Sequence, residues 1–276
     1  KGDLGPVFWR EEYILDDRIA RFPKPYVAYM DGLVMGGGTG LAAHGSHRVV
    51  NDKTKVGMPE VGIGFFPDVG GSWLLSRAPG EVGTYFGLTG QTMNGADAIF
   101  TGFADFYVPS AKWPELRCAL TALPNGADAA QVANTIRGFT ETPQPGIAEQ
   151  HRTQIDKLFG HDSVEAIVAA LRADGSTFAQ ATLKAMSDKS PTSLKVALRL
   201  LRAARTSTSL QECLAREYRA ALQVFDSAEF IEGVRAAIID KDRQPKWQPA
   251  RIEDVTPEIV GRYFAPRAGD QLVFPR

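Results

Sequence analysis

The distribution of apolar residues changes near residue 111. Before that point, short apolar runs alternate with glycine- and proline-rich turns, which is typical of short strands and helices packed together. The first such run, Tyr26–Met30, predicts a buried strand. From Lys112 onward, apolar residues recur at intervals of three and four, as in Leu210–Phe225, which predicts amphipathic helices. We therefore expect a mixed α/β core over residues 1–111 and a helical region over 112–276 packed on it.

The elements predicted for the first part are short. An amphipathic helix is expected over Asp3–Phe22, where Pro23 and Pro25 end it. Further helices are predicted over 39–44, from 73, over 83–89 and over 95–100. Strands are predicted over 47–50, 55–58 and 106–108.

Three adjacent glycines, Gly36, Gly37 and Gly38, lie between the predicted strand and the helix expected from Thr39. Glycine lets a ligand approach the backbone closely, and the first N–H groups of a helix attract negative charge. Such a turn suits a phosphate, or an oxyanion that forms during acyl transfer. The simpler interpretation is a tight turn with close helix packing, and the glycines alone favour it.

Two carboxylates follow downstream, and each stands directly after a proline. Glu60 and Asp68 lie in apolar, glycine-rich surroundings with few cations nearby. In an apolar pocket the pKa of a carboxyl group rises, and the group can then serve as acid, base or nucleophile. The alternative for Asp68 is a helix N-cap ahead of residues 69–75.

These features belong to a longer ordered set of motifs in the first quarter of the chain. The set comprises Lys24–Ala28, Asp31-Gly32, Met35–Gly38, Met58–Glu60, Gly64 and Phe66–Gly71. Together they resemble the crotonase (enoyl-CoA hydratase/isomerase) superfamily. The resemblance implies an α/β fold, a spiral of ββα units followed by a helical C-terminal region, and an acyl-CoA as the small-molecule substrate.

Two positions point to the hydrolase branch of this superfamily. Hydratases that resemble this chain would carry a second glutamate where Gly40 stands and a glycine where Asp68 stands. The resemblance therefore implies hydrolysis of a short, branched β-hydroxyacyl-CoA thioester, such as the 3-hydroxyisobutyryl-CoA of valine degradation, to the free acid and CoA. The alternatives are hydration or isomerisation with Glu60 as the base, and a crotonase-fold subunit without catalytic activity.

The resemblance also implies roles for single residues. The Gly37 N–H would bind the thioester oxygen, Glu60 would attack the carbonyl or activate a water, and Asp68 would bind the substrate hydroxyl or assist the leaving thiolate. Substrate-binding positions by resemblance are Glu12, Gly36, Gly38 and Lys241. From spacing alone, Glu12 is typical of a solvated helix face, and Lys241 fits the charged end of a C-terminal helix at least as well as a binding position. The family's first ββα turns, with a Gly-Gly-Asp segment that completes the oxyanion hole, are expected to lie upstream of this sequence.

Composition argues against several other classes of function. The 276 residues carry a net charge of −1, which gives no electrostatic case for nucleic acid or membrane binding. No apolar run approaches the length of a bilayer span. Two cysteines make no disulfide framework and fit a reducing compartment, a bacterial cytoplasm or a mitochondrial matrix. The proposed chemistry needs no cofactor beyond the CoA of the substrate and no metal, and the resemblance makes a homo-oligomer (trimer or hexamer) possible.

Two clusters of polar residues have simple structural interpretations. His44 and His47 stand three residues apart, but no third ligand has a suitable spacing, so a structural role is favoured over a metal site. Four basic residues recur along one predicted helix, which is typical of a solvated face, although they could also attract the phosphates of CoA. They are Lys195, Arg199, Arg202 and Arg205.

Overall fold

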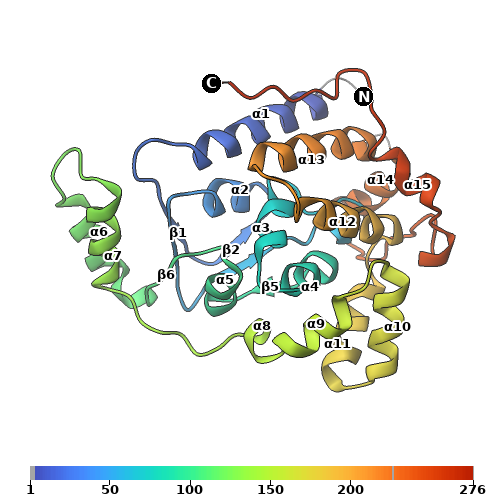
Figure 1. Ribbon diagram of the computed structural model, residues 1–276, viewed down its shortest axis with the longest axis horizontal. Helices are drawn as coiled ribbons and strands as arrows, with labels where there is room; N and C mark the ends of the chain where they lie inside the picture. Colours follow the sequence, from blue (N-terminus) through green and yellow to red (C-terminus); the bar gives the residue numbers. More distant parts are fainter. Residues whose placement is uncertain (1–3, 226, 276) are drawn as a thin grey trace.

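Two small sheets form the centre of the fold, and helices surround them (Figure 1). The computed structural model describes residues 4–225 and 227–275. One sheet has the strand order β1-β3-β6 and the other β2-β4-β5. The strands are β1 (Val27–Met30), β2 (Leu33–Met35), β3 (His47–Val50), β4 (Lys55–Gly57), β5 (Thr92–Met93) and β6 (Phe106–Tyr107).

Successive pairs of strands build these sheets as a spiral. β1 and β2 are separated only by Asp31-Gly32, and Gly32 takes a positive φ of 89° that favours glycine. The helix α2 (Gly37–Ala43) then returns the chain to β3, which pairs in parallel with β1, and to β4, which pairs in parallel with β2. β6 extends the first sheet in parallel, and β5 adds an antiparallel edge to the second. This repetition confirms the predicted α/β fold of ββα units.

The first glycine turn differs from the sequence prediction. The strand that leads into the glycines is β2, not the predicted strand at Tyr26–Met30, because the chain turns at Gly32 and pairs again with β4. α2 begins at Gly37, two residues before the predicted start at Thr39. The predicted helix start at Asp3 lies outside the described residues.

The remaining helices account for most of the chain. Helix α1 spans Leu4–Ala20, and the short 3-10 helix η1 spans Glu60–Ile63. The others are α3 (Gly71–Arg77), α4 (Val82–Thr89), α5 (Gly95–Thr101), α6 (Trp113–Thr121), α7 (Ala129–Arg137), α8 (Ile147–Gln150), α9 (Arg152–Phe159), α10 (Val164–Asp174), α11 (Thr177–Ser187), α12 (Pro191–Ala204), α13 (Leu210–Phe225), α14 (Ala228–Val234) and α15 (Pro257–Arg262). A π-helical turn, Arg235–Ile239, continues α14. None of the helices in the described ranges is long and apolar enough to cross a membrane.

The C-terminal helices pack directly on the spiral. α13 lies beside α1, and α12 packs against α3 and α4 (Figure 1). One hydrophobic core contains Tyr13 and Phe66 from the first part together with Leu198 and Tyr218 from the helical region. The C-terminal helices therefore bury, and help to position, the segments that carry the predicted acids.

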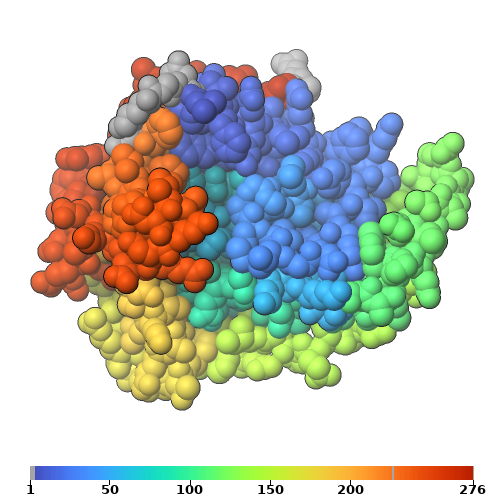
Figure 2. Space-filling model, turned by 180° about the vertical axis from the view of Figure 1, so that it is seen from behind, coloured from blue at the N-terminus to red at the C-terminus, as the bar shows by residue number. Residues whose placement is uncertain are grey.

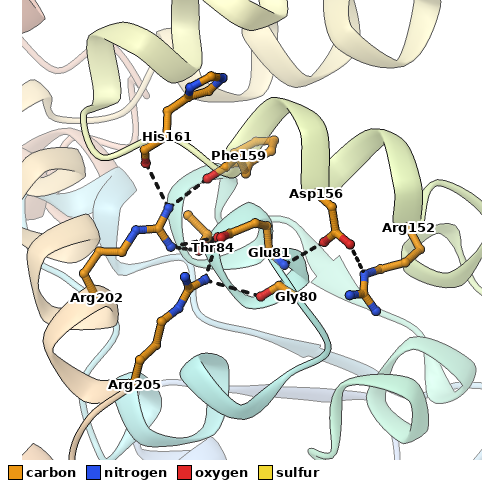
Figure 3. A network of polar contacts seen from close by, with 9 residues as sticks. All are labelled: Gly80, Glu81, Thr84, Arg152, Asp156, Phe159, His161, Arg202 and Arg205. Atoms are coloured by element: carbon orange, nitrogen blue, oxygen red, sulfur yellow. Dashed lines mark hydrogen bonds and ion pairs between the residues drawn. The ribbon is translucent and has the colours of Figure 1, made fainter.

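Two of the basic residues on α12 hold helices together. Arg202 and Arg205 both pair with Glu81, at 2.7 and 2.6 Å, immediately before α4 begins (Figure 3). Arg202 also donates to the backbone carbonyls of Phe159 and His161 at 2.8 and 2.9 Å. These contacts tie α12 to α4 and to the end of α9, so the two arginines are structural.

The other two basic residues of this helix are also engaged. Lys195 pairs with Glu165 at 2.6 Å and donates to the carbonyl of Val255, and the Arg199 guanidinium lies 4.1 Å from the centre of the Phe264 ring. None of the four basic residues lines the cavity that contains Glu60 and Asp68. The contacts favour the structural interpretation of this helix face over CoA-phosphate binding.

Candidate active site

A cavity of about 980 Å³ lies between the first part of the chain and the C-terminal segments. On the face shown in Figure 2, blue N-terminal and orange-red C-terminal atoms flank a recess in which teal atoms are visible. The cavity brings together two of the predicted acids, one of the predicted glycines and two cations from distant segments. Its lining includes Trp9, Gly36, Glu60, Asp68, Lys189 and Arg243.

The glycine turn forms one wall. Gly36 takes a φ of 55° and caps the N-terminus of α2, so it occupies a conformation that L side chains rarely adopt. A side chain on Gly37 would meet the Glu12 carboxylate, since its Cβ would lie 2.6 Å from Glu12 Oε1. Gly38 has open space around it. The Gly37 N–H stands in the first turn of α2, where backbone donors have no acceptor within the helix.

Not all of the predicted binding residues line the main cavity. Glu12 and Gly37 line a neighbouring cavity of about 300 Å³, together with Asp16 and Phe8. Lys241 is exposed and is absent from the main lining, which receives Arg243 from the same loop instead.

The two predicted acids are both buried and close enough to influence each other. Glu60 begins η1, and each side chain is only 6% exposed. Burial raises the pKa of both groups, and the Asp68 carboxylate raises the pKa of Glu60 further. Among the described residues, Glu60 Oε2 is buried without a hydrogen-bond partner. A basic carboxyl group with an unused oxygen suits proton transfer or nucleophilic attack near neutral pH.

Asp68 begins a strained loop and does not cap a helix. The predicted N-cap role is wrong, because Gly70 occupies the N-cap of α3 and the Asp68 side chain accepts a hydrogen bond from the Tyr13 hydroxyl at 2.8 Å. Val69 takes a φ of 49°, which is an outlier for a β-branched residue. Such strain persists only where the surroundings impose it.

Two further buried side chains impose this loop conformation. Glu217 of α13 accepts hydrogen bonds from the N–H groups of Gly70 and Ser72, at 2.8 and 3.0 Å, and from the Ser72 hydroxyl. His44 Nε2 lies 2.8 Å from the Val69 carbonyl. Burial lowers the pKa of His44, so the ring is neutral at pH 7, and Nε2 carries its proton because a carbonyl can only accept. The His47 ring bonds to Ser46 and to a backbone carbonyl, so both histidines make the structural contacts that the sequence favoured.

Gly40 is enclosed by acidic and apolar side chains. A Cβ at this position would collide with Asp16 Oδ1 and would lie 3.0 Å from the Val69 Cβ. Asp16 is 1% exposed, and burial raises its pKa to about 9, so it is neutral at pH 7. The position where a hydratase-like chain would carry its second glutamate therefore has no room for a side chain here.

Sequence inspection missed Tyr13, His44 and Glu217 as residues that support the site. Tyr13 fits the apolar face of its helix as an ordinary core residue. Glu217 is one of several charged residues on its helix and stands 149 positions from Asp68. Within the described ranges, no group of histidine, cysteine and acidic residues is arranged to hold a metal ion.

The chain belongs to the enoyl-CoA hydratase/isomerase family, whose model matches residues 2–264. It is similar to proteins named 3-hydroxyisobutyryl-CoA hydrolase, mitochondrial. The Xenopus tropicalis protein is 42% identical over 273 residues, which cover 98% of this chain and 71% of the relative. The Homo sapiens protein is 40% identical over 279 residues, which cover 99% and 72%.

Solved structures of bacterial proteins share the fold over nearly the whole chain. One is described as a carnitinyl-CoA dehydratase from Mycobacterium thermoresistibile, with a TM-score of 0.90, 43% identity, and coverage of 98% of this chain and 76% of that chain. Another is described as an enoyl-CoA hydratase from Rhodobacter sphaeroides, with a TM-score of 0.87, 42% identity, and coverage of 98% and 77%. Some of these similar proteins are named hydrolases and others hydratases or dehydratases. The choice between these activities for this chain therefore depends on the residues of its site.

Proposed function

We propose that this protein hydrolyses 3-hydroxyisobutyryl-CoA, or a closely similar short β-hydroxyacyl-CoA, to the free acid and CoA. The observation that carries this proposal is the buried pair Glu60 and Asp68 in one cavity with Gly36, combined with the absence of space for a side chain at Gly40. The hydratases that this chain resembles would carry their second acid at the position of Gly40 to deliver water across a double bond, and thioester cleavage does not need an acid there. The names of the animal relatives agree with the hydrolase alternative.

In this mechanism the backbone and the two acids have separate roles. The Gly37 N–H, directly after the Gly36 that lines the main cavity, stabilises the oxyanion that forms when the thioester carbonyl is attacked. Glu60 either attacks that carbonyl, which gives a mixed anhydride that water then cleaves, or takes the proton of an attacking water. The C–S bond breaks, and the CoA thiolate leaves with a proton. Asp68 accepts a hydrogen bond from the substrate hydroxyl or assists that proton transfer, and Glu12 supports the acyl end beside Gly37.

The reaction requires no cofactor other than the CoA that the substrate carries. A reducing compartment, either a mitochondrial matrix or a bacterial cytoplasm, fits the low cysteine content, and the word mitochondrial in the names of the animal relatives favours the former for a eukaryotic source.

A paired assay tests the proposal. CoA release from 3-hydroxyisobutyryl-CoA is followed with a thiol reagent, and loss of crotonyl-CoA absorbance is followed in parallel. We expect rapid thiol release and unchanged crotonyl-CoA absorbance. Loss of crotonyl-CoA without thiol release would replace the proposal with hydratase activity, the alternative that agrees with the descriptions of the two solved structures.

Two cations on the cavity wall suit the phosphates of CoA. Lys189 is half-buried, and burial lowers the pKa of its ammonium group. The Asp188 carboxylate partly offsets this shift, but the ammonium group makes no hydrogen bond or ion pair within the described part of the chain, which leaves it available for an anionic ligand. Arg243 lines the same cavity from a loop position with a φ of 55°. In this proposal these residues take the binding role that the family resemblance suggested for Lys241.

Replacing Lys189 by glutamine is expected to raise KM for the CoA ester about tenfold, equivalent to ~1.4 kcal/mol of binding, with kcat little changed. The pantetheine thioester of the same acid lacks the nucleotide phosphates, so its KM should be the same for both proteins. Lys184→Gln provides the matched control, because Lys184 is exposed on α11. Equal losses with both substrates would contradict phosphate binding by Lys189.

A further inference from the structure

The Tyr13 hydroxyl is the only side-chain donor to the Asp68 carboxylate among the residues described. Tyr13 is fully buried, and its hydroxyl donates to Asp68 Oδ2 at 2.8 Å. Its ring packs edge-on against Tyr218, with centroids 6.3 Å apart, where α1 meets α13. A ring enclosed in this way has little freedom to turn its hydroxyl elsewhere.

The backbone directly after Asp68 is held independently of Tyr13. His44 holds the Val69 carbonyl, and Glu217 holds the Gly70 N–H. These contacts do not restrict the rotation of the Asp68 side chain. The hydrogen bond from Tyr13 fixes that rotation. Because Tyr13 occupies Oδ2, Oδ1 remains as the oxygen that Asp68 offers to a ligand in the main cavity, which Asp68 lines.

The charged groups around Asp68 make this side-chain donor important, beside the backbone hydrogen bond at Asp68 that also lowers its pKa. All the charged neighbours of Asp68 that affect these pKa values are acids. Glu217 and Glu12 raise the pKa of Asp68, and Asp68 in turn raises the pKa of Asp16 and Glu60. Burial and the negative groups raise the pKa of Asp68, whereas the Tyr13 hydrogen bond lowers it. The Tyr13 hydroxyl therefore both orients the carboxyl group and stabilises its ionised form, in which both oxygens accept hydrogen bonds.

We propose that Tyr13 is a positioning residue for substrate selection: by holding Oδ2, it presents Asp68 Oδ1 to the β-hydroxyl group of the acyl chain. This inference rests on the proposed hydrolase function and adds a determinant of its acyl specificity. A site built to bond a substrate hydroxyl discriminates strongly against an analogue that lacks it, because its own polar group is then left unpaired. Removing the Tyr13 hydroxyl frees the Asp68 carboxyl to rotate and weakens that discrimination.

The test compares 3-hydroxyisobutyryl-CoA with isobutyryl-CoA, which differs only by the hydroxyl group. In Tyr13→Phe, the ratio of kcat/KM for the two esters is expected to fall about tenfold, with the loss confined to the hydroxylated ester. Tyr218→Phe is the matched control. It removes a hydroxyl from the same aromatic pair, one that bonds to Arg10 and to the Pro6 carbonyl, and it should leave the ratio unchanged.

Each remaining outcome overturns a defined part of the inference. An unchanged ratio, or an equal loss with both esters, would reduce Tyr13 to a core residue. Should Y13F fail to fold, 3-fluorotyrosine at position 13 retains the ring and supplies a stronger donor, and a ratio that does not rise would contradict the proposal. If the wild-type protein released CoA from neither ester, the hydrolase function would fail. Calorimetric binding of the two esters would then test Tyr13, because Y13F should still weaken only the hydroxylated one.

Discussion

Glu60→Gln is expected to lower kcat for CoA release by about three orders of magnitude, because glutamine can neither attack a thioester carbonyl nor accept a proton from water. The substitution is nearly isosteric. The Glu60 side chain is buried, and its Oε2 has no hydrogen-bond partner among the described residues, so an amide group at that atom breaks no hydrogen bond. KM and thermal stability should therefore change little. Thiol release under single-turnover conditions, together with a thermal unfolding curve, measures both.

A second buried glutamate provides the control for this substitution. Glu229 is also largely buried, and burial raises its pKa to about 7, but its carboxylate bonds to Ser190 and Thr192 and does not line the cavity. Glu229→Gln should retain kcat within a few-fold. Near-normal turnover in Glu60→Gln would remove Glu60 from the chemistry. A similar loss in both variants would point to a general effect of neutralising buried acids.

The elements that were predictable from the sequence are those fixed by local patterns. The helix predicted over Leu210–Phe225 has the same ends as α13, because its apolar spacing and length suffice to define it. Ser190 before Pro191 predicts the start of α12, and its side chain does accept the capping bond from the Ser193 N–H. The strand β2 (Leu33–Met35) was not predicted, although the similarly short β4 and β6 were, because it follows β1 after only two residues and is defined by its pairing with β4.

The candidate site also contains residues that local sequence motifs mark and residues that only the folded chain brings together. Glu60, Asp68 and the glycines were found because prolines and glycines mark their loops in the sequence. The orientation of Asp68 was not predictable, because it depends on Tyr13 and Glu217, which reach the loop from α1 and α13. Lys189 and Arg243 were missed for a related reason, since neither stands in a local motif and only the folded chain brings them to the cavity.

Glu217→Ala is expected to lower the free energy of unfolding by about 3 kcal/mol at pH 6 and to reduce kcat/KM as well. The substitution leaves the N–H groups of Gly70 and Ser72 and the Ser72 hydroxyl without their buried acceptor. The strained Val69 can then relax, and Asp68 moves with it. Denaturant unfolding and thiol release measure the two effects. Glu212→Ala on the same helix is the control, because Glu212 is exposed and bonds only to Thr208, so its loss should cost under about 1 kcal/mol.

The pH dependence of the Glu217→Ala effect distinguishes a buried acid from an ordinary hydrogen-bond acceptor. Burial raises the pKa of Glu217 to about 7, above its usual value of 4.5. Between these values the folded protein holds a proton that the unfolded chain has lost, so the stability that Glu217 contributes is complete at low pH and falls as the pH rises through 7. The difference in unfolding free energy between wild type and variant should therefore be larger at pH 5 than at pH 7, with a slope of at most ~1.4 kcal/mol per pH unit. A difference that stayed constant or grew over this range would mean that Glu217 is ionised throughout and that its hydrogen bonds outweigh the effect of burial.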